Sequence, residues 1–283
     1  MIDKYFSTAR ERYRIHLNQR AGEPWPWTAD PVFRQFRFCN THRELDKTTV
    51  WFRENVRHRH PEDLYRTTLN TVIFRWFNRI ETGEALLRRG LFDRWDAKEA
   101  EGLLRGVRPV VTGAYLIKTP DGMGKLDGVI HLIEEARRVL PDVVRDWQRL
   151  RPQELRAACH ELMTIPYLGG FMAHQVVADL KYTPVLGDAR DRLTWAYPGP
   201  GTLRGVGRLV AGDPTIFRDS TKDQPRVLEI LRATQRASTG EEFWPADWPR
   251  WEMSDISNWF CEFDKYCRAE EGGRMKRKYQ PCT

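Results

Sequence analysis

The amino-acid sequence predicts a mainly α fold, and three observations support this class. Apolar residues recur at helical spacing in the long segments of the chain. A Pro-Tyr-Leu-Gly-Gly turn at 166–170 separates two such segments, so we expect a helix-hairpin-helix over 152–181. Strand signals are sparse, and we expect few short strands, at 107–117 and near Phe36.

The first long helix is expected from Leu64, because apolar residues recur every three or four positions up to Ile80. Pro61 suits the start of this helix and Gly83 its end. A second amphipathic helix is expected over 126–140. Pro141 should end it, because proline lacks the backbone N–H that a helix interior needs.

Further along the chain, Pro152 opens a helix that runs to about Met163, and 171–180 forms the helix after the hairpin. The last helix is expected to begin at a Ser254 cap and to end at Gly272-Gly273. Its apolar face comprises Ile256, Trp259, Phe260, Phe263 and Cys267. We expect one catalytic unit over 1–283, with an N-terminal arm (1–35), a helical body (36–253) and a C-terminal helix with a basic tail (254–283).

The glycine hairpin indicates contact with a DNA backbone. Gly169 and Gly170 let the main chain approach a phosphate closely. They also lie at a helix N-terminus, where amide N–H groups and the helix dipole favour anions. Tyr167 belongs to the same turn, so we expect all three residues to lie at phosphates.

Composition favours an anionic partner. The 283 residues carry a formal net charge of +7. Arginine, whose planar fork matches phosphate, outweighs lysine, although many basic proteins bind nothing anionic. No apolar run is long enough for a membrane span. The five cysteines are odd in number and lack a C-x-x-C pair, which indicates reduced thiols in the cytosol, with neither an iron–sulfur cluster nor zinc.

Carboxylates and arginines alternate after the hairpin, at Asp188, Arg190, Asp191 and Arg192. Two aspartates three positions apart share one face of a helical turn, where one carboxyl would have a raised pKa and serve as a base. The neighbouring arginines suit an anionic leaving group. The alternative is a solvated loop with surface ion pairs.

Two further groups of polar residues are candidates. Asp179 lies among apolar residues of the helix after the hairpin, where an acid is either structural or functional, and Gln175 of that helix can contact a base edge. The segment 36–57 mixes aromatic and polar side chains, and its candidate residues are Arg37, Asn40, Arg43 and Asp46. They either line a cleft in which aromatics stack on an extruded base or form a solvated face.

One glycine-rich stretch, 121–128, does not match a P-loop, because Leu126 replaces the Ser or Thr that would bind magnesium.

Five ordered blocks of the chain resemble the alpha-glutamyl/putrescinyl thymine pyrophosphorylases, phage amino acid:DNA transferases of thymidine hypermodification. The blocks are FRFCNTHRELDKTTVWF, TGAYLI, GGFMAHQVVADLKYTP, TWAYPGPGTLRGVGRL and MSDISNWFCEFDKY. The resemblance implies a helical fold related to the helix-hairpin-helix DNA glycosylases. Where lyase-type glycosylases have a nucleophilic lysine, this chain has Phe171, which argues against a Schiff-base mechanism.

The resemblance also implies a reaction. The substrate would be double-stranded DNA carrying 5-(pyrophosphoryloxymethyl)uracil, and an amine such as glycine, glutamate or a polyamine would replace the pyrophosphate on an extruded base. Asp188 or Asp191 would accept the proton of the amine, and Arg37 or Arg43 would hold a donor carboxylate. The arginines expected to stabilise the departing pyrophosphate are Arg190, Arg192, Arg204 and Arg208.

The expected partners follow from this reaction. They are modified double-stranded DNA and a small amine donor, with no membrane, and the protein is expected to be a monomer in the cytoplasm of the phage-infected host. No organic cofactor is expected, and an acidic pair beside a pyrophosphate permits Mg²⁺ without requiring it. The alternatives are a monofunctional glycosylase for a modified pyrimidine and a non-catalytic DNA-binding accessory.

Overall fold

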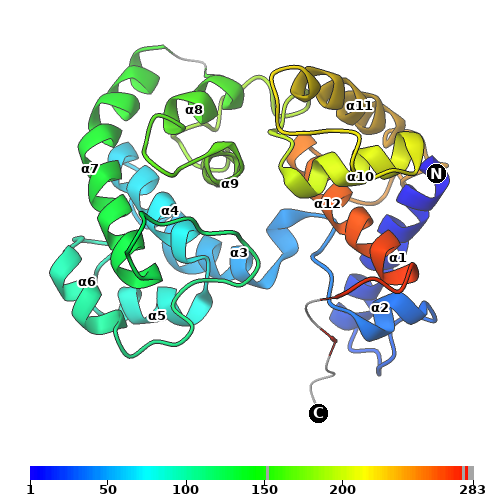
Figure 1. Cartoon of the computed structure of the whole chain (residues 1–283), viewed down its shortest axis with the longest axis horizontal. Helices are drawn as coiled ribbons and strands as arrows, with labels where there is room; N and C mark the ends of the chain where they lie inside the picture. Colours follow the sequence, from blue (N-terminus) through cyan, green and yellow to red (C-terminus); the bar gives the residue numbers. More distant parts are fainter. Residues whose placement is uncertain (151–152, 276–277, 280–283) are drawn as a thin grey trace. The chain divides into compact units, whose positions relative to one another are not determined.

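The chain forms a mainly α structure, as predicted (Figure 1). The computed structural model describes residues 1–150, 153–275 and 278–279, and within them the only strand-like pairing is an isolated bridge between Phe36 and Lys278. The strand predicted at 107–117 is wrong. Its backbone bonds to neighbouring helices instead of to a second strand: the Val110 carbonyl accepts a hydrogen bond from Thr82, and the Thr112 N–H donates to Phe77.

The chain gathers into two compact units, which we describe separately. Unit 1 consists of Met1–Asp46 and Leu193–Thr283, and unit 2 consists of Lys47–Arg192. These bounds differ from the three segments expected from the sequence, because helices from the two ends of the chain pack together within unit 1.

Unit 1 has an aromatic core. Its helices are α1 (Ile2–Arg20), α2 (Pro31–Gln35), α10 (Pro200–Ala211), α11 (Asp223–Ala237) and α12 (Met253–Glu270), with a short 3-10 turn η1 (Arg43–Leu45). Tyr5 and Phe6 of α1 and Trp259 and Phe260 of α12 are completely buried. The Trp259 indole N–H donates to the Tyr5 carbonyl at 3.2 Å, so polar atoms inside this core are paired as well.

Glycines bring α10 and α12 together. A Cβ atom added at Gly205 would lie 2.0 Å from the Phe260 carbonyl oxygen, and one added at Gly201 would lie 2.2 Å from the Cys261 Sγ. Only a residue without a side chain fits at these positions, so the Gly-Pro-Gly segment serves helix packing.

Unit 2 surrounds a buried central helix. Its elements are α3 (Lys47–Phe52), the π-helical turn η2 (Arg53–Arg57), α4 (Leu64–Phe77), α5 (Ile80–Arg88), α6 (Ala97–Leu104), α7 (Lys125–Arg149), α8 (Leu155–Leu162) and α9 (Gly170–Leu180). Helix α4 packs against both α7 and α9. Its residues 67–77 are all buried, and the polar ones among them are hydrogen-bonded: Asn70 donates to the Phe92 carbonyl and Thr71 to the Thr67 carbonyl.

Two predicted helix ends in unit 2 are wrong. Gly83, the predicted end of the first helix, lies inside α5, where a Cβ atom would come within 2.5 Å of the Trp51 ring. Helix α4 ends earlier, at the C-cap Asn78, whose φ of 44° is left-handed. Helix α7 continues through Pro141 to Arg149. Beyond the proline, α7 buries Val144 and Trp147, and this burial opposes the roughly 3 kcal/mol that a helix-interior proline costs.

The helices around the hairpin and at the C-terminal end largely agree with expectation. Helix α9 covers the predicted 171–180, whereas Pro152 lies outside the described residues. The apolar face predicted for α12 is buried. The Ser254 cap is wrong: Glu252 is the N-cap, and it exchanges side-chain hydrogen bonds with Asp255 in a capping box, which satisfies two amides at once.

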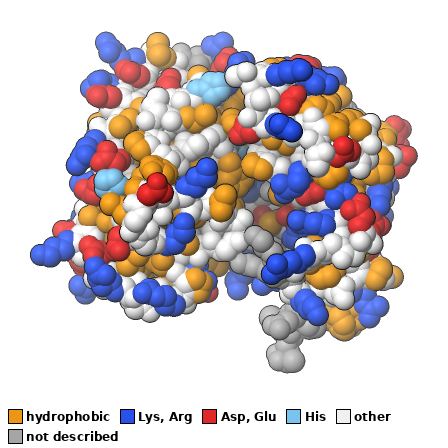
Figure 2. Space-filling view, viewed as in Figure 1, with side chains coloured by type: hydrophobic (Ala, Val, Ile, Leu, Met, Phe, Trp, Pro, Cys, Tyr) orange, Lys and Arg blue, Asp and Glu red, His pale blue; other side chains and the backbone are white. Residues whose placement is uncertain are grey.

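Charge of both signs covers the surface. In Figure 2, lysine and arginine side chains are interspersed with aspartate and glutamate over the visible face. Within the part of the chain that the structure describes, no helix is long and apolar enough to cross a membrane. Cys39, Cys159, Cys261 and Cys267 are free thiols, and Cys282 lies outside the described residues.

Candidate functional site

The connection between α8 and α9 holds the three residues predicted to contact DNA. Tyr167 has a left-handed φ of 62° and is 47% exposed. Gly169 is the N-cap of α9 and offers no side-chain cap to the first amides of the helix. A Cβ atom at Gly169 would meet nothing within 4 Å, so this glycine faces open space. The start of α9, at the buried Gly170, therefore has no side-chain cap, and contact of this turn with a DNA phosphate stays a prediction.

Gln175 lies one turn further along α9 and is held from outside the helix. Its Oε1 accepts a hydrogen bond from the Tyr115 hydroxyl at 3.0 Å. The Tyr115 ring also packs edge-on against Phe171, with 5.1 Å between ring centroids. The segment before α7 is thereby attached to the N-terminal half of α9.

Asp179 lies at the buried end of α9 and is paired with arginines. Its carboxylate accepts two hydrogen bonds from Arg75 of α4, at 2.5 and 2.8 Å, and Arg57 Nη1 lies 3.9 Å away. Arg75 also donates to Asn78 at 2.8 Å. All three charged side chains are almost completely buried, and a buried pair of this kind requires such hydrogen bonds. The pairing indicates that Asp179 positions Arg75, and its predicted catalytic role stays a prediction.

Three cations converge on the ring of Tyr182, just beyond α9. Arg57, Lys181 and Arg192 lie 5.0, 4.9 and 5.1 Å from its centroid. An aromatic face attracts cations. Arg57 and Lys181 are almost completely buried, and Arg57 also lies beside the Asp179 carboxylate, whereas Arg192 is half-buried. We call these four residues the Tyr182 cation cluster.

The alternating residues after α9 have different surroundings. Asp191 accepts hydrogen bonds from the amides of Leu155 and Arg156, at 2.7 and 3.0 Å, and so caps the first turn of α8. Asp188 and Arg190 are exposed on the turn, and Arg192 belongs to the Tyr182 cation cluster. Asp188 is therefore the better candidate for a proton acceptor, because both oxygens of Asp191 accept helix amides.

In unit 1, Asp46 is the centre of a second polar group. Its carboxylate accepts a hydrogen bond from the backbone N–H of Asn40 at 2.7 Å. Desolvation raises the pKa of the Asp46 carboxyl to about 7. The Arg12 guanidinium opposes this shift. Asn40 and Arg12 are 8% and 9% exposed, and Asn40 Oδ1 and Arg12 Nη1 have no hydrogen-bond partner among the residues that the structure describes.

The remaining predicted arginines also lie in unit 1. Arg37 is exposed, and its carbonyl accepts from Lys265, whereas Arg43 is buried and its backbone N–H donates to Asp255 at 3.1 Å. Arg204 and Arg208 of α10 pair with Asp264 of α12, at 2.9 and 2.8 Å. These ion pairs join two packed helices, and a role of the arginines at pyrophosphate stays a prediction.

Sequence reasoning missed Arg57, Arg75, Lys181 and Tyr182, as well as Arg12 and Tyr115. Arg75 left a usable signal, because it lies in the apolar run TVIFRWF and a buried arginine needs a carboxylate. Asp179, an acid in an equally apolar helix, was the matching partner. Nothing comparable in the sequence points to Tyr182.

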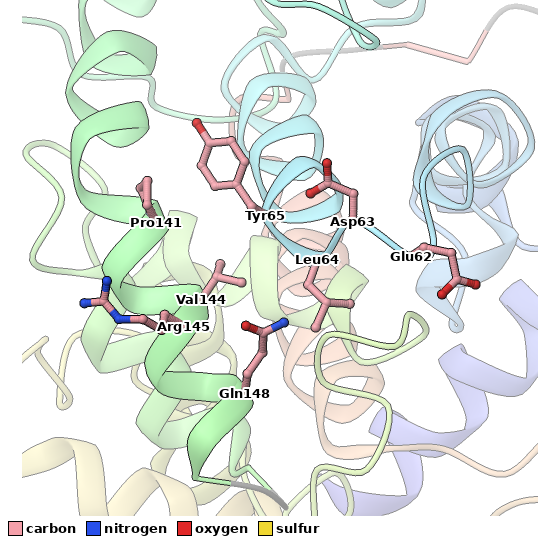
Figure 3. A pocket seen from close by; sticks show the side chains of 8 residues that line it. All are labelled: Glu62, Asp63, Leu64, Tyr65, Pro141, Val144, Arg145 and Gln148. Atoms are coloured by element: carbon pink, nitrogen blue, oxygen red, sulfur yellow. The ribbon is translucent and has the colours of Figure 1, made fainter.

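A groove elsewhere on unit 2 contains none of these residues. It has a volume of about 510 Å³ and lies between the start of α4 and the second half of α7 (Figure 3). Its charged lining includes Asp63, which caps α4 by accepting from the Arg66 amide, and Arg145, which pairs with Asp142. These groups are engaged in local structure, so we assign the groove no function.

Thiols and metal ligands give no further candidate. Burial raises the pKa of Cys159 to about 12, so this thiol is not a thiolate at neutral pH. Among the described residues, no three His, Cys, Asp or Glu side chains lie close enough to hold one metal ion.

The structure is that of a mainly α protein with three cations around one aromatic ring in unit 2. The family described as "5-hmdU DNA kinase, helical domain" matches residues 1–274, and the chain belongs to this family. The predicted resemblance to thymidine-hypermodification enzymes is thereby confirmed at the level of the family, whereas the pyrophosphorylase subfamily stays a prediction.

A curated relative is the 5-hmdU DNA kinase of Bacillus phage SP10. It is 30% identical over 295 residues, which cover 93% of this chain and 44% of the relative. The chain thus spans less than half the length of the curated relative that it matches. No solved structure matches this chain significantly.

Proposed function

We propose that this protein is a phage DNA-modifying transferase that replaces the pyrophosphate of 5-(pyrophosphoryloxymethyl)uracil with an amine. The Tyr182 cation cluster carries this proposal, because cations can stabilise a departing polyanion and Arg192 of the cluster is half-buried rather than fully enclosed. The family supports the substrate class, since its description and that of the SP10 relative both name 5-hmdU in DNA. Activity would take place in the cytoplasm of the infected host.

The chemistry balances as a substitution at one carbon. The neutral amine nitrogen forms a bond to the methylene carbon on C5 of the uracil, and the bond from that carbon to the pyrophosphate oxygen breaks. The electron pair leaves with pyrophosphate, and a carboxylate takes the proton of the amine. The base must first leave the helix stack, because the carbon is not accessible inside a duplex.

One carboxylate of unit 2 is suited to take the proton. Asp188 is exposed on the turn that leads to Arg192 of the Tyr182 cation cluster. For DNA binding, the open start of α9 supplies amides for a backbone phosphate.

A second candidate function is recognition of 5-hmdU DNA without catalysis. The family description supports it, because the matched region is described as the helical domain of a kinase. The sequence lacks the G-x-x-x-x-G-K-[ST] motif, so phosphoryl transfer by a P-loop in this chain is not part of either proposal.

The test is a donor screen on modified duplex DNA. The protein is incubated with DNA containing 5-(pyrophosphoryloxymethyl)uracil and one amino acid or polyamine at a time, and nucleosides and free pyrophosphate are then measured. A new nucleoside that carries the donor, with equimolar pyrophosphate, is expected. Abasic sites would instead indicate a glycosylase, and bound but unchanged DNA the recognition function.

Matched variants connect the result to the cluster. Arg192→Gln should slow the transfer by roughly 10- to 100-fold, because it removes one cation from the leaving group. Arg138→Gln should leave the rate unchanged, since this arginine forms an exposed pair with Glu135 on α7. Equal rates for both variants would exclude the cluster as the pyrophosphate site.

A further inference from the structure

The segment between α6 and α7 is fixed to its neighbours at several points. The Thr112 N–H donates to the Phe77 carbonyl at 2.8 Å, and Lys125 Nζ donates to the Ile117 carbonyl at 2.6 Å. Thr119 packs so closely on α7 that a Cβ atom at Gly128 would lie 2.5 Å from it. This segment is therefore held in place although it has no regular secondary structure.

Burial alternates along this segment. Tyr115 and Thr119 are half-buried and Ile117 is 4% exposed, whereas Leu116 and Lys118 between them are exposed. Leu116 is 82% exposed, more than any other large apolar side chain among the described residues. The anchored neighbours thus hold a leucine and a lysine outward, where a free loop would let the leucine fold onto the surface.

The exposed leucine adjoins the predicted DNA-binding turn. Tyr115, its neighbour in the chain, packs on Phe171 and bonds to Gln175 in the first turns of α9. The start of α9, with Gly169 facing open space, is where a backbone phosphate is expected. An exposed leucine is therefore the chain neighbour of a tyrosine that contacts the first turns of α9.

We propose that Leu116 is a wedge that enters the base stack of duplex DNA and fills the gap left by the extruded nucleotide. This inference rests on the proposed action on DNA. A base leaves the stack at a cost of a few kcal/mol, and proteins offset this cost by inserting apolar side chains between base steps. Lys118, on the same outward side, suits a phosphate flanking the gap.

The experiment measures base unstacking without any donor. A duplex with 5-hydroxymethyluracil next to 2-aminopurine is titrated with wild-type protein, Leu116→Ala and Leu116→Met, and 2-aminopurine fluorescence reports unstacking. Wild type should raise the fluorescence, Leu116→Met should retain the rise, and Leu116→Ala should lose most of it. Leu116→Ala should also weaken duplex binding by roughly tenfold, since a leucine burial contact is lost.

Leu150→Ala is the matched control, because Leu150 is 66% exposed and lies at the C-terminal end of the 25-residue α7, whereas the segment that carries Leu116 leads into the start of that helix. It should behave like wild type, and all variants should keep the wild-type Tm. Equal unstacking by wild type and Leu116→Ala, or no unstacking by wild type, would overturn the wedge. The donor screen tests the transferase separately, so a failed wedge and a failed transferase give different results.

Discussion

At the scale of single residues, desolvation decides which carboxylates can act as acids or bases near neutral pH. Asp46 accepts the Asn40 amide and lies near Glu262, and desolvation outweighs both that hydrogen bond and the attraction of Arg12. Its raised pKa is a property of unit 1 that titration of the folded protein can detect.

The first prediction concerns the stability of Asp46→Asn. Between the ordinary carboxyl value of 3.8 and about 7, the folded state holds a proton that the unfolded state has lost. The free energy of unfolding of the wild type therefore falls as pH rises through this window. Asparagine keeps the acceptor for Asn40 but cannot ionise. Relative to wild type, the variant should gain on the order of 1–2 kcal/mol between pH 4 and pH 8.

Urea unfolding at the two pH values measures this difference. Asp142→Asn is the control, since its side chain is 70% exposed on α7 and should show no comparable gain. Parallel pH profiles for wild type and Asp46→Asn would contradict the raised pKa.

The second prediction concerns the buried pair in unit 2. Arg75→Met should lower the free energy of unfolding by about 3–5 kcal/mol, because Asp179 would remain buried without its bidentate partner. Arg138→Met, which removes an exposed pair, should cost less than about 0.5 kcal/mol. Thermal and urea denaturation measure both. The double variant Arg75→Met/Asp179→Leu should recover most of the lost unfolding free energy, because it leaves no unpaired charge in the core. If the double variant instead loses the sum of what Arg75→Met and Asp179→Leu each lose alone, the explanation is refuted.

Much of the candidate site could be located from residue types, but the role of each residue could not. The glycines of the hairpin and the polar run 188–192 are visible as motifs. The capping role of Asp191 depends on where α8 begins, and the pairing of Arg204 with Asp264 depends on which helices pack. Both are tertiary contacts, which one sequence does not contain.

At the scale of elements, the start of α9 combines an uncapped helix end with a glycine that has free space around it. Gly169 has a φ of −67°, which alanine adopts easily. No steric reason inside the described part of the protein therefore requires glycine at this position, which is compatible with the proposed approach of a phosphate to the main chain.

The third prediction follows from this free space. Gly169→Ala should weaken duplex DNA binding roughly 5- to 20-fold, because its methyl group would stand between the α9 amides and a phosphate. Its unfolding free energy should change by less than about 1 kcal/mol. Gly102→Ala in α6, where a Cβ atom also meets nothing within 4 Å, should leave binding unchanged. Fluorescence anisotropy measures affinity, and unaltered affinity of Gly169→Ala would exclude the hairpin from the interface.

Helix positions were predictable from periodicity, but several boundaries were not. The apolar faces of α4, α7 and α12 follow their spacing in the sequence. Local signals failed where packing outweighed them: α7 continues through Pro141 because Val144 and Trp147 are buried beyond it. Gly83, in turn, is needed for contact with Trp51 and does not end a helix.

At the scale of the whole molecule, the chain leaves unit 1 after Asp46 and returns at Leu193. Unit 2 is one continuous segment with its own core around α4, whereas unit 1 needs both flanking segments to complete its aromatic core. No local pattern in the sequence indicates that unit 2 is inserted between the two segments of unit 1.

The fourth prediction tests the independence of unit 2. A protein comprising only residues 47–192 should be helical by circular dichroism and should unfold in one cooperative transition, because its buried core lies within that segment. Residues 1–46 expressed alone should not show a cooperative transition. A segment 47–192 that unfolds gradually would show that its core needs the rest of the chain.

The packing of α1 on α12 also determines when unit 1 can form during translation. Tyr5 and Phe6 are made among the first residues of this chain, yet the Trp259 and Phe260 side chains that cover them are made more than two hundred positions later. Unit 2 has all of its residues by position 192, so it can fold on the ribosome while α1 still exposes its aromatic face. Helix α1 is therefore among the last helices to be buried, and until then its aromatic residues are exposed to aggregation or to capture by a chaperone.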